Sequence, residues 1–209
     1  GLLADDHGGW TYHTVLAAAP SPIPAAPVSE ETSEVSWVPV DEVGRMPLHP
    51  GFEAQWPALR SALNPVTVVV DIANVMGSRP DGWWRDRAGA AARLLAQIAD
   101  LAMTGVVALP DDLAAPALER WFPRFVVVLE GVAARGVEDG PDTSAAGGEE
   151  LPVVVVRAPG SGDDEIVRQT AAHSVHGPTL VITADRELRS RCAAVEAAVT
   201  GPRWLLDRL

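Results

Sequence analysis

The stretch VTVVVDIANV, residues Val66–Val75, decides the fold that we expect for this chain. Its β-branched residues form a short, continuous apolar run, which is typical of a strand covered on both faces. The run ends in the polar residues Asp71 and Asn74, where such a strand reaches the edge of its sheet. We therefore predict a buried strand over Val66–Val75.

Downstream of this stretch, apolar runs alternate with segments of helical periodicity. The predicted strands are Gly105–Leu109, Phe125–Gly131, Pro152–Ala158 and Thr179–Asp185. The predicted helices are Asp86–Ala102, Asp111–Phe122, Asp163–Val175 and Arg186–Ala198, and a short strand and helix close the chain. The polar, Gly-rich stretch Gly136–Glu150 is predicted to be a loop. This alternation indicates an α/β fold with a mostly parallel sheet and helices on both faces.

The N-terminal part has a different character, rich in Trp, Pro and acidic residues. The elements expected there are strands over Thr11–Ala19 and Ser33–Val40 and a helix over Phe52–Leu63 that Pro57 interrupts. Pro65 starts the regular segment and cannot donate a hydrogen bond within a sheet, which suits a linker. We therefore predict two domains, residues 1–64 and 65–209.

Composition narrows the class of protein. The chain has 209 residues, of which 47% are hydrophobic, and its net charge is -12. This charge argues against coating nucleic acid through bulk positive charge, but an enzyme can still grip a few phosphates locally. All 16 basic residues are arginines, so side-chain contacts to phosphate would come from guanidinium groups. The single cysteine, Cys192, excludes an internal disulfide, and the apparent lack of a membrane span or signal peptide predicts a soluble, cytoplasmic protein.

Acidic residues follow three of the predicted strands. They are Asp71, Asp163, Asp164 and Asp185, and Asn74 lies three residues after Asp71. In a parallel sheet the carboxyl ends of the strands share one edge, where neighbouring strands are about 4.8 Å apart. We therefore expect these side chains to lie in one site.

Carboxylates gathered this closely repel one another, and a hard divalent cation removes the repulsion. Mg²⁺ and Mn²⁺ prefer carboxylate oxygens, amide oxygens and water, and they polarise phosphoryl oxygens. Each residue also has a simpler interpretation: Asp163, Asp164 and Asp185 could cap helices, and Asn74 could serve a turn. Because three strands stop at Asp in the same topological position, we favour a shared metal site.

The motifs VVVDIANVMGSRPDGWW, GSGDDEIV and ITADRELRSR resemble the NYN/PIN-like domains, relatives of the PIN nucleases, over about Val66–Leu209. The resemblance implies a three-layer α/β/α fold and a ribonuclease that depends on Mg²⁺ or Mn²⁺. By position it implies that the catalytic and metal-binding acids are Asp71, Asp163, Asp164 and Asp185. The chain departs from the family in lacking a clear acid from the middle strands, where Glu130 is a weak candidate.

The segment Gly77–Arg87 contains three Arg, two Asp and two adjacent Trp. Arg side chains bind phosphate and Trp rings stack on bases, a combination used on single strands. Equally, the two Trp could cover the edge of the sheet while Arg and Asp pair locally. The candidate substrate-binding residues are Asn74, Ser78, Arg79, Trp83, Trp84, Arg85 and Arg186.

The N-terminal motifs DDHGGWTYHTVLA and WVPVDEVGRMPLHPGFEAQWPALR resemble the C-terminal part of Nudix hydrolases, over roughly Gly1–Leu63. Those enzymes cleave nucleoside diphosphates linked to another group. The Nudix box that binds Mg²⁺ is absent here and is expected upstream of Gly1. This resemblance implies a partial α+β Nudix-like segment.

The function that we predict is metal-dependent hydrolysis of phosphodiester bonds, with RNA or a nucleotide as substrate. Two alternatives stay open: a non-catalytic module that binds RNA or nucleotides, and a Nudix hydrolase that is truncated here. A homodimer is possible, and no membrane partner is expected.

Overall fold

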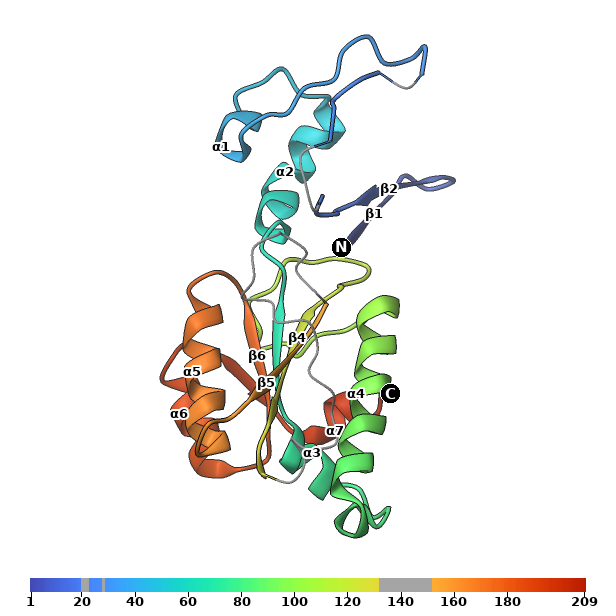
Figure 1. Cartoon of the computed structure of the whole chain (residues 1–209). Helices are drawn as coiled ribbons and strands as arrows, with labels where there is room; N and C mark the ends of the chain where they lie inside the picture. Colours follow the sequence, from blue (N-terminus) through green and yellow to red (C-terminus); the bar gives the residue numbers. More distant parts are fainter. Residues whose placement is uncertain (20–22, 28, 132–151) are drawn as a thin grey trace.

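A computed structural model describes residues 1–19, 23–27, 29–131 and 152–209. The predicted loop Gly136–Glu150 lies outside the described residues. Figure 1 shows the β-sheet with helices on either side and the N-terminal elements stacked beyond one end of the sheet. Within the described ranges, no helix is both long enough and apolar enough to cross a membrane.

The centre of the molecule is a five-stranded sheet with the order β5-β4-β3-β6-β7. Its strands are β3 (Thr67–Asp71), β4 (Arg124–Leu129), β5 (Val153–Arg157), β6 (Thr179–Ile182) and β7 (Ala198–Thr200). Every neighbouring pair is parallel, and Val69 of β3 aligns with Val126 of β4 and Val181 of β6. The predicted parallel sheet is confirmed, and all its carboxyl ends lie along one edge.

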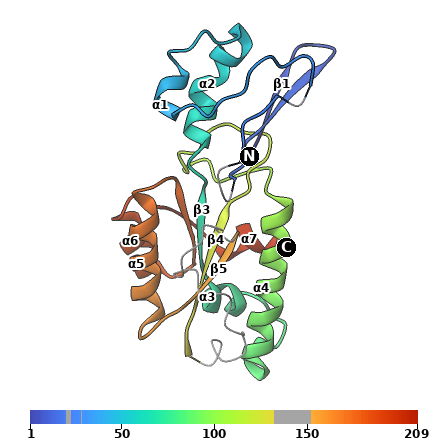
Figure 2. The same ribbon diagram turned by 45° about the horizontal axis from the view of Figure 1, so that its top comes forward.

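Helices cover both faces of the sheet, as Figures 1 and 2 show. One face carries α3 (Ile72–Gly77), α4 (Arg87–Thr104) and α7 (Pro202–Leu206), and the other carries α5 (Gly162–Ser174) and α6 (Arg186–Ala193). Alternate residues of a strand point to opposite faces, so Val68 and Val70 pack in the first layer and Val69 in the second. Cys192 is fully buried in the second layer. The fold is therefore a three-layer α/β/α arrangement, as predicted.

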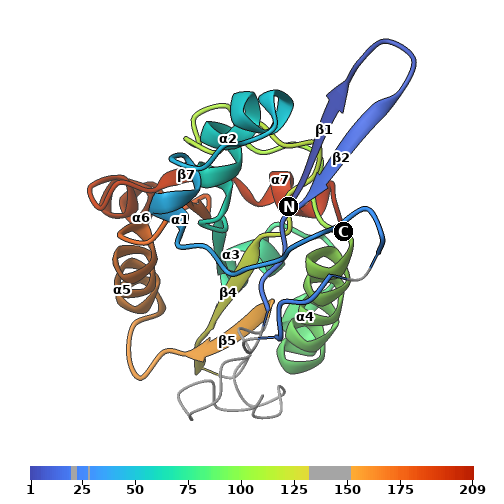
Figure 3. The same cartoon turned by 90° about the horizontal axis from the view of Figure 1, so that it is seen from above.

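The N-terminal residues form a hairpin and two helices: β1 (Leu2–Asp6), β2 (Thr11–Val15), α1 (Val40–Val43) and α2 (Pro50–Ala62). The hairpin projects from the body of the molecule in Figure 3. Its Leu2 exchanges backbone hydrogen bonds with Glu119 and Arg120, which ties it to the second half of the chain. Pro57 does not interrupt α2, contrary to the prediction, because a proline removes only one backbone donor from the helix.

Two elements predicted after α4 are not formed. The strand predicted over Gly105–Leu109 is wrong, because Val106 makes only an isolated bridge with Trp121. The helix predicted over Asp111–Phe122 is also wrong. Pro116 has no N–H to donate to a helix, and its carbonyl accepts a hydrogen bond from the Trp121 indole at 3.1 Å instead.

Other predicted strands are wrong or end early. The segment Ser33–Val40 is irregular up to the start of α1, so no strand forms there. The strand predicted over Val66–Val75 ends at Asp71, because the chain turns directly into α3. Likewise, the strand predicted over Thr179–Asp185 ends at Ile182. The sheet is therefore shorter than predicted: Asp71 is the last paired residue of β3, opposite Val128, and Asp185 lies beyond the end of β6.

We predict that residues 65–209 unfold cooperatively when expressed alone, whereas residues 1–64 do not. Leu59 is the only buried residue among those described in the first 64, so that part lacks a core of its own. Hydrogen exchange on the two separate pieces measures the difference. Strong protection throughout residues 1–64 alone would contradict the prediction.

Candidate functional site at the carboxyl edge of the sheet

Asp71 lies at the carboxyl end of the central strand and is only 8% exposed. One of its carboxylate oxygens, Oδ1, accepts a hydrogen bond from the backbone N–H of Asn74 at 3.0 Å, which caps α3. The other, Oδ2, accepts from the Thr183 hydroxyl at 2.9 Å. Both oxygens are thus held in place, and the carboxylate is fixed at the edge of the sheet.

Two connections that are far apart in sequence are joined at this point. Thr183 accepts a hydrogen bond from the backbone N–H of Asp185 at 3.2 Å while it donates to Asp71. The Asn74 side chain accepts from the backbone N–H of Ala184 at 2.9 Å. Asn74 was predicted to bind substrate, but in this structure its amide oxygen links β3–α3 to β6–α6.

Thr183 was not singled out in the sequence, although it is completely buried. A buried hydroxyl needs a partner, so its position directly after an apolar strand and two residues before Asp185 was the available signal. That signal is weak, because Thr is also an ordinary strand residue.

Glu130 directly follows β4 and points toward the start of α5. Its Oε2 accepts a hydrogen bond from the backbone N–H of Gly162 at 3.0 Å. A Cβ at residue 162 would stand 2.5 Å from that oxygen, so this close approach requires glycine. The weak sequence candidate Glu130 is therefore held at the same edge as Asp71.

Asp163 and Asp164 are neighbours in α5, but they have different surroundings. Asp164 forms an ion pair with Arg191 at 2.6 Å on an exposed surface. Asp163 has no ion pair of this kind among the described residues. The charges that act on it are chiefly those of Asp185 and Glu130.

The raised pKa values of Asp71 and Asp163 connect these two acids with Glu130 and Asp185, whose charges act on them. Burial raises the pKa of Asp71, the charges of Asp163 and Glu130 raise it further, and the hydrogen bonds from Asn74 and Thr183 oppose the shift. Burial also raises the pKa of Asp163, as do the charges of Asp185 and Glu130, whereas Arg191 lowers it. We call Asp71, Glu130, Asp163 and Asp185 the acidic edge.

Asp185 also caps a helix, as the simpler interpretation predicted. It is the N-cap of α6, and its Oδ1 accepts a hydrogen bond from the backbone N–H of Leu188 at 2.8 Å. One carboxylate oxygen thus serves the helix. The cap and a place in the acidic edge are compatible, because a carboxylate has a second oxygen.

The donor chemistry of the acidic edge suits a hard cation, since it consists of carboxylate oxygens that repel one another. However, no three His, Cys, Asp or Glu side chains in the described part of the chain are arranged to hold one metal ion together. Mg²⁺ commonly takes only one or two carboxylates and keeps several waters. The acidic edge fits that mode better than a closed cage of protein ligands.

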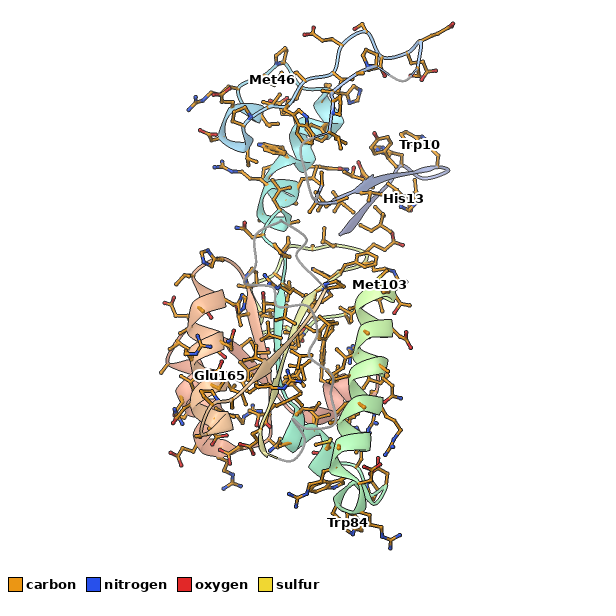
Figure 4. The ribbon with its side chains drawn as sticks, in the orientation of Figure 1. Trp10, His13, Met46, Trp84, Met103 and Glu165 are labelled. Atoms are coloured by element: carbon orange, nitrogen blue, oxygen red, sulfur yellow. The ribbon has the colours of Figure 1, made fainter. Side chains whose placement is uncertain are left out.

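The loop after α3 separates its two tryptophans. Trp83 starts the 3₁₀ turn η1 (Trp83–Arg85) and packs against the core, whereas Trp84 is 57% exposed. Figure 4 shows Trp84 at the far end of the molecule from Trp10 and Met46. Of the two tryptophans predicted either to stack on bases or to cover the sheet, Trp83 is partly buried against the core and Trp84 is exposed.

The remaining predicted binding residues are mostly engaged elsewhere or simply exposed. The Ser78 hydroxyl donates to the Asn74 carbonyl at 2.9 Å, which closes the end of α3. Arg79 donates to the Gln97 side chain of α4 at 3.0 Å. Arg85 and Arg186 are exposed. In this structure Ser78 and Arg79 therefore brace the loop.

Comparison with known proteins gives one short sequence match. No model of a known protein family matches the chain. Over 63 residues the chain is 46% identical to "Putative 8-oxo-dGTP diphosphatase 3", a Nudix hydrolase, from two strains of Mycobacterium tuberculosis, CDC 1551 and H37Rv. The match covers 30% of this chain and 28% of each relative. The chain thus spans less than a third of the length of these relatives.

Among solved structures, a mutant of Rae1 (YacP) from Bacillus subtilis is similar to this chain with a TM-score of 0.44 and 16% sequence identity. The similarity covers 68% of this chain and 72% of the other. At that level it carries no weight for function, so the acidic edge has to be judged from its own geometry.

We predict that Asp163→Asn flattens the pH dependence of stability in the metal-free protein. Because the pKa values of Asp71 and Asp163 are raised in the folded state, their stabilising contribution is present at low pH and is lost as the pH rises through those values. The variant should therefore be neutral or stabilised near neutral pH. Urea unfolding in chelator from about pH 4 to 7 measures this. A variant destabilised equally at every pH would contradict the prediction.

Proposed function

We propose that this protein is a metal-dependent phosphodiester hydrolase that acts on RNA. The observation that carries the proposal is the acidic edge, in which the charges of Glu130 and Asp185 act on Asp163 and the charges of Asp163 and Glu130 act on the buried Asp71. Folding places these like charges together although doing so costs stability. Such an arrangement is typical of a functional site rather than of a purely structural one.

The residues that would hold a divalent cation are Asp163, with Asp71, Glu130 and Asp185 acting directly or through water. Mg²⁺ and Mn²⁺ both match these oxygen donors. When bound, the cation would supply charge stabilisation for the scissile phosphate and would lower the pKa of a water molecule. Asp71 is held by Asn74 and Thr183, so it would act from a fixed position.

Glu130 is placed to handle a proton. Its Oε2 is held by the Gly162 N–H, and its Oε1 has no hydrogen bond among the described residues. That second oxygen can accept a proton from a water molecule that attacks the phosphate, which is general-base catalysis. The Gly162 contact sets the direction of the carboxylate and would thereby orient that water molecule.

RNA is proposed as substrate because of the sequence motifs that surround the acidic edge. The motifs at 68–84, 160–167 and 182–191 resemble NYN/PIN-like domains, and they contain Asp71, Asp163 and Asp185. Glu130 lies outside the three motifs. It enters the proposal through its hydrogen bond with Gly162 and through the effect of its charge on Asp71 and Asp163.

A second candidate function is hydrolysis of a nucleoside di- or triphosphate. The 46% identity over 63 residues to "Putative 8-oxo-dGTP diphosphatase 3" favours it. The carboxylates of the acidic edge lie outside Gly1–Leu63, the segment whose motifs resemble Nudix hydrolases.

We predict that Asp163→Asn reduces Mn²⁺-dependent cleavage of a mixed RNA pool at least about a hundredfold. Asp164→Asn is the matched control, because it changes the next residue of the same helix, whose exposed side chain pairs with Arg191 and is not a member of the acidic edge. Its rate should stay within about threefold of the original. The same preparations should be assayed with 8-oxo-dGTP. Loss of diphosphatase activity alone, or equal effects of both variants on RNA cleavage, would sink the nuclease proposal.

We also predict that Gly162→Ala lowers RNA cleavage as much as Glu130→Gln does, because the new Cβ displaces the Glu130 carboxylate. The unfolding free energy should change by less than about 1 kcal/mol, since the displaced atom ends a flexible side chain and alanine favours the helix. Gly201→Ala is the control, because nothing lies within 4 Å of a Cβ at that position. Full activity in Gly162→Ala would remove Glu130 from the mechanism.

A further inference from the structure

A pocket of about 450 Å³ lies beside the acidic edge. Ala73 and Met76 of α3 line it, together with Trp83 and Arg87 from the segment before and at the start of α4. Glu130 and Gly160 border it on the side of the sheet. The volume falls within the roughly 300–1,000 Å³ that is usual for small-molecule sites. Because Glu130 belongs to both, the pocket and the acidic edge are continuous.

The aromatic wall of this pocket is held firmly. Trp83 packs against the hydrophobic core, and a Cβ on Gly77 would contact its ring at 3.9 Å. The guanidinium of Arg87 lies 5.4 Å from the centre of the same ring, which is a cation–π distance. Trp84 meets Trp83 edge-on at 6.3 Å. An indole fixed in this way can stack on a planar ligand without first being ordered.

The charges of Glu130 and Arg87 indicate which part of a nucleotide the pocket can bind. The Glu130 carboxylate at its border repels a phosphate, so the uncharged base and not the phosphate is the part that suits the inside of the pocket. Arg87 is exposed and makes no ion pair within the described residues, so its donors can reach a phosphate outside the pocket. The pocket thus combines an aromatic wall with the exposed cation Arg87.

We infer that this pocket binds one unstacked nucleobase of a single-stranded RNA, with Arg87 on the adjoining phosphate. The inference rests on the proposed function, because it places the base next to the acidic edge where the chain would be cut. It also assigns different roles to two adjacent residues. Trp83 stacks on the base, and the exposed Trp84 does not.

The test is binding of a short fluorescent oligoadenylate in chelator, measured by anisotropy, so that no cleavage is needed. Trp83→Leu keeps an apolar side chain but removes the stacking surface, and it should raise the Kd about tenfold. Trp84→Leu should change the Kd less than about twofold, because that ring stands outside the pocket. Trp83→Phe should bind nearly as the original protein does, which shows that a fold defect is not the cause.

An abasic oligonucleotide of the same length separates bases from phosphates. The original protein should bind it about tenfold more weakly than oligoadenylate, and Trp83→Leu should weaken that binding no further. Three results would contradict base binding in this pocket: equal affinity for both probes, no binding of either probe, or an increase in Kd for Trp84→Leu as large as that for Trp83→Leu. Mn²⁺-dependent cleavage by the original protein is a separate outcome. If the protein cleaves RNA but its affinity does not depend on Trp83, only the inference about the pocket is wrong. If the protein binds the base but does not cleave RNA, only the proposed hydrolase function is wrong.

Discussion

The hydrogen bond from the Thr183 hydroxyl to Asp71 is the contact on which the acidic edge depends. It joins the carboxyl ends of two neighbouring strands, β3 and β6, and it fixes Asp71, the buried member of the acidic edge. A second hydrogen bond, from the Ala184 backbone N–H to the Asn74 side-chain oxygen, links the same two segments. With both ends of the strands tied, Asp185 can begin α6 only at a short distance from Asp71. The position of one acid therefore follows from the position of the other.

The arginines near the acidic edge do not neutralise it. The Arg189 guanidinium donates hydrogen bonds to the backbone carbonyls of Thr183 and Val199, and Arg191 forms an ion pair with Asp164. Arg186 is exposed, and the charge of Arg191 only partly offsets the repulsion at Asp163, whose pKa stays raised. Unbalanced carboxylates at the end of a parallel sheet are a place for a cation or for a proton in transit.

The two parts of the chain differ in how well they bury their apolar side chains. The sheet and its helices enclose a continuous core, whereas the N-terminal residues expose large aromatic side chains such as Trp10 (60%) and Trp37 (64%). The short match to the Mycobacterium tuberculosis diphosphatases spans 63 residues and leaves most of those proteins unmatched. The sheet and its helices carry the acidic edge, and backbone hydrogen bonds of Leu2 with Glu119 and Arg120 connect the N-terminal hairpin to the later part of the chain.

Periodicity in the sequence was enough to predict the parallel sheet, its two helical layers and the acids at the ends of β3 and β6. Each of these depends on local patterns, because a buried strand must be continuously apolar and a helix must bury one face. The prediction failed where proline removed donors, as in the segment around Pro116, and where one bridge replaced a strand at Val106.

The tertiary structure alone decided the details of the site. Asp163 and Asp164 are adjacent and chemically identical, yet only the packing of α5 against α6 turns Asp164 to Arg191. Similarly, only packing half-buries Trp83 and leaves Trp84 exposed. The contacts of Glu130 with Gly162 and of Thr183 with Asp71 span 32 and 112 residues. Local sequence determined which residues stand at the ends of the elements, but contacts between distant segments determined which way their side chains point.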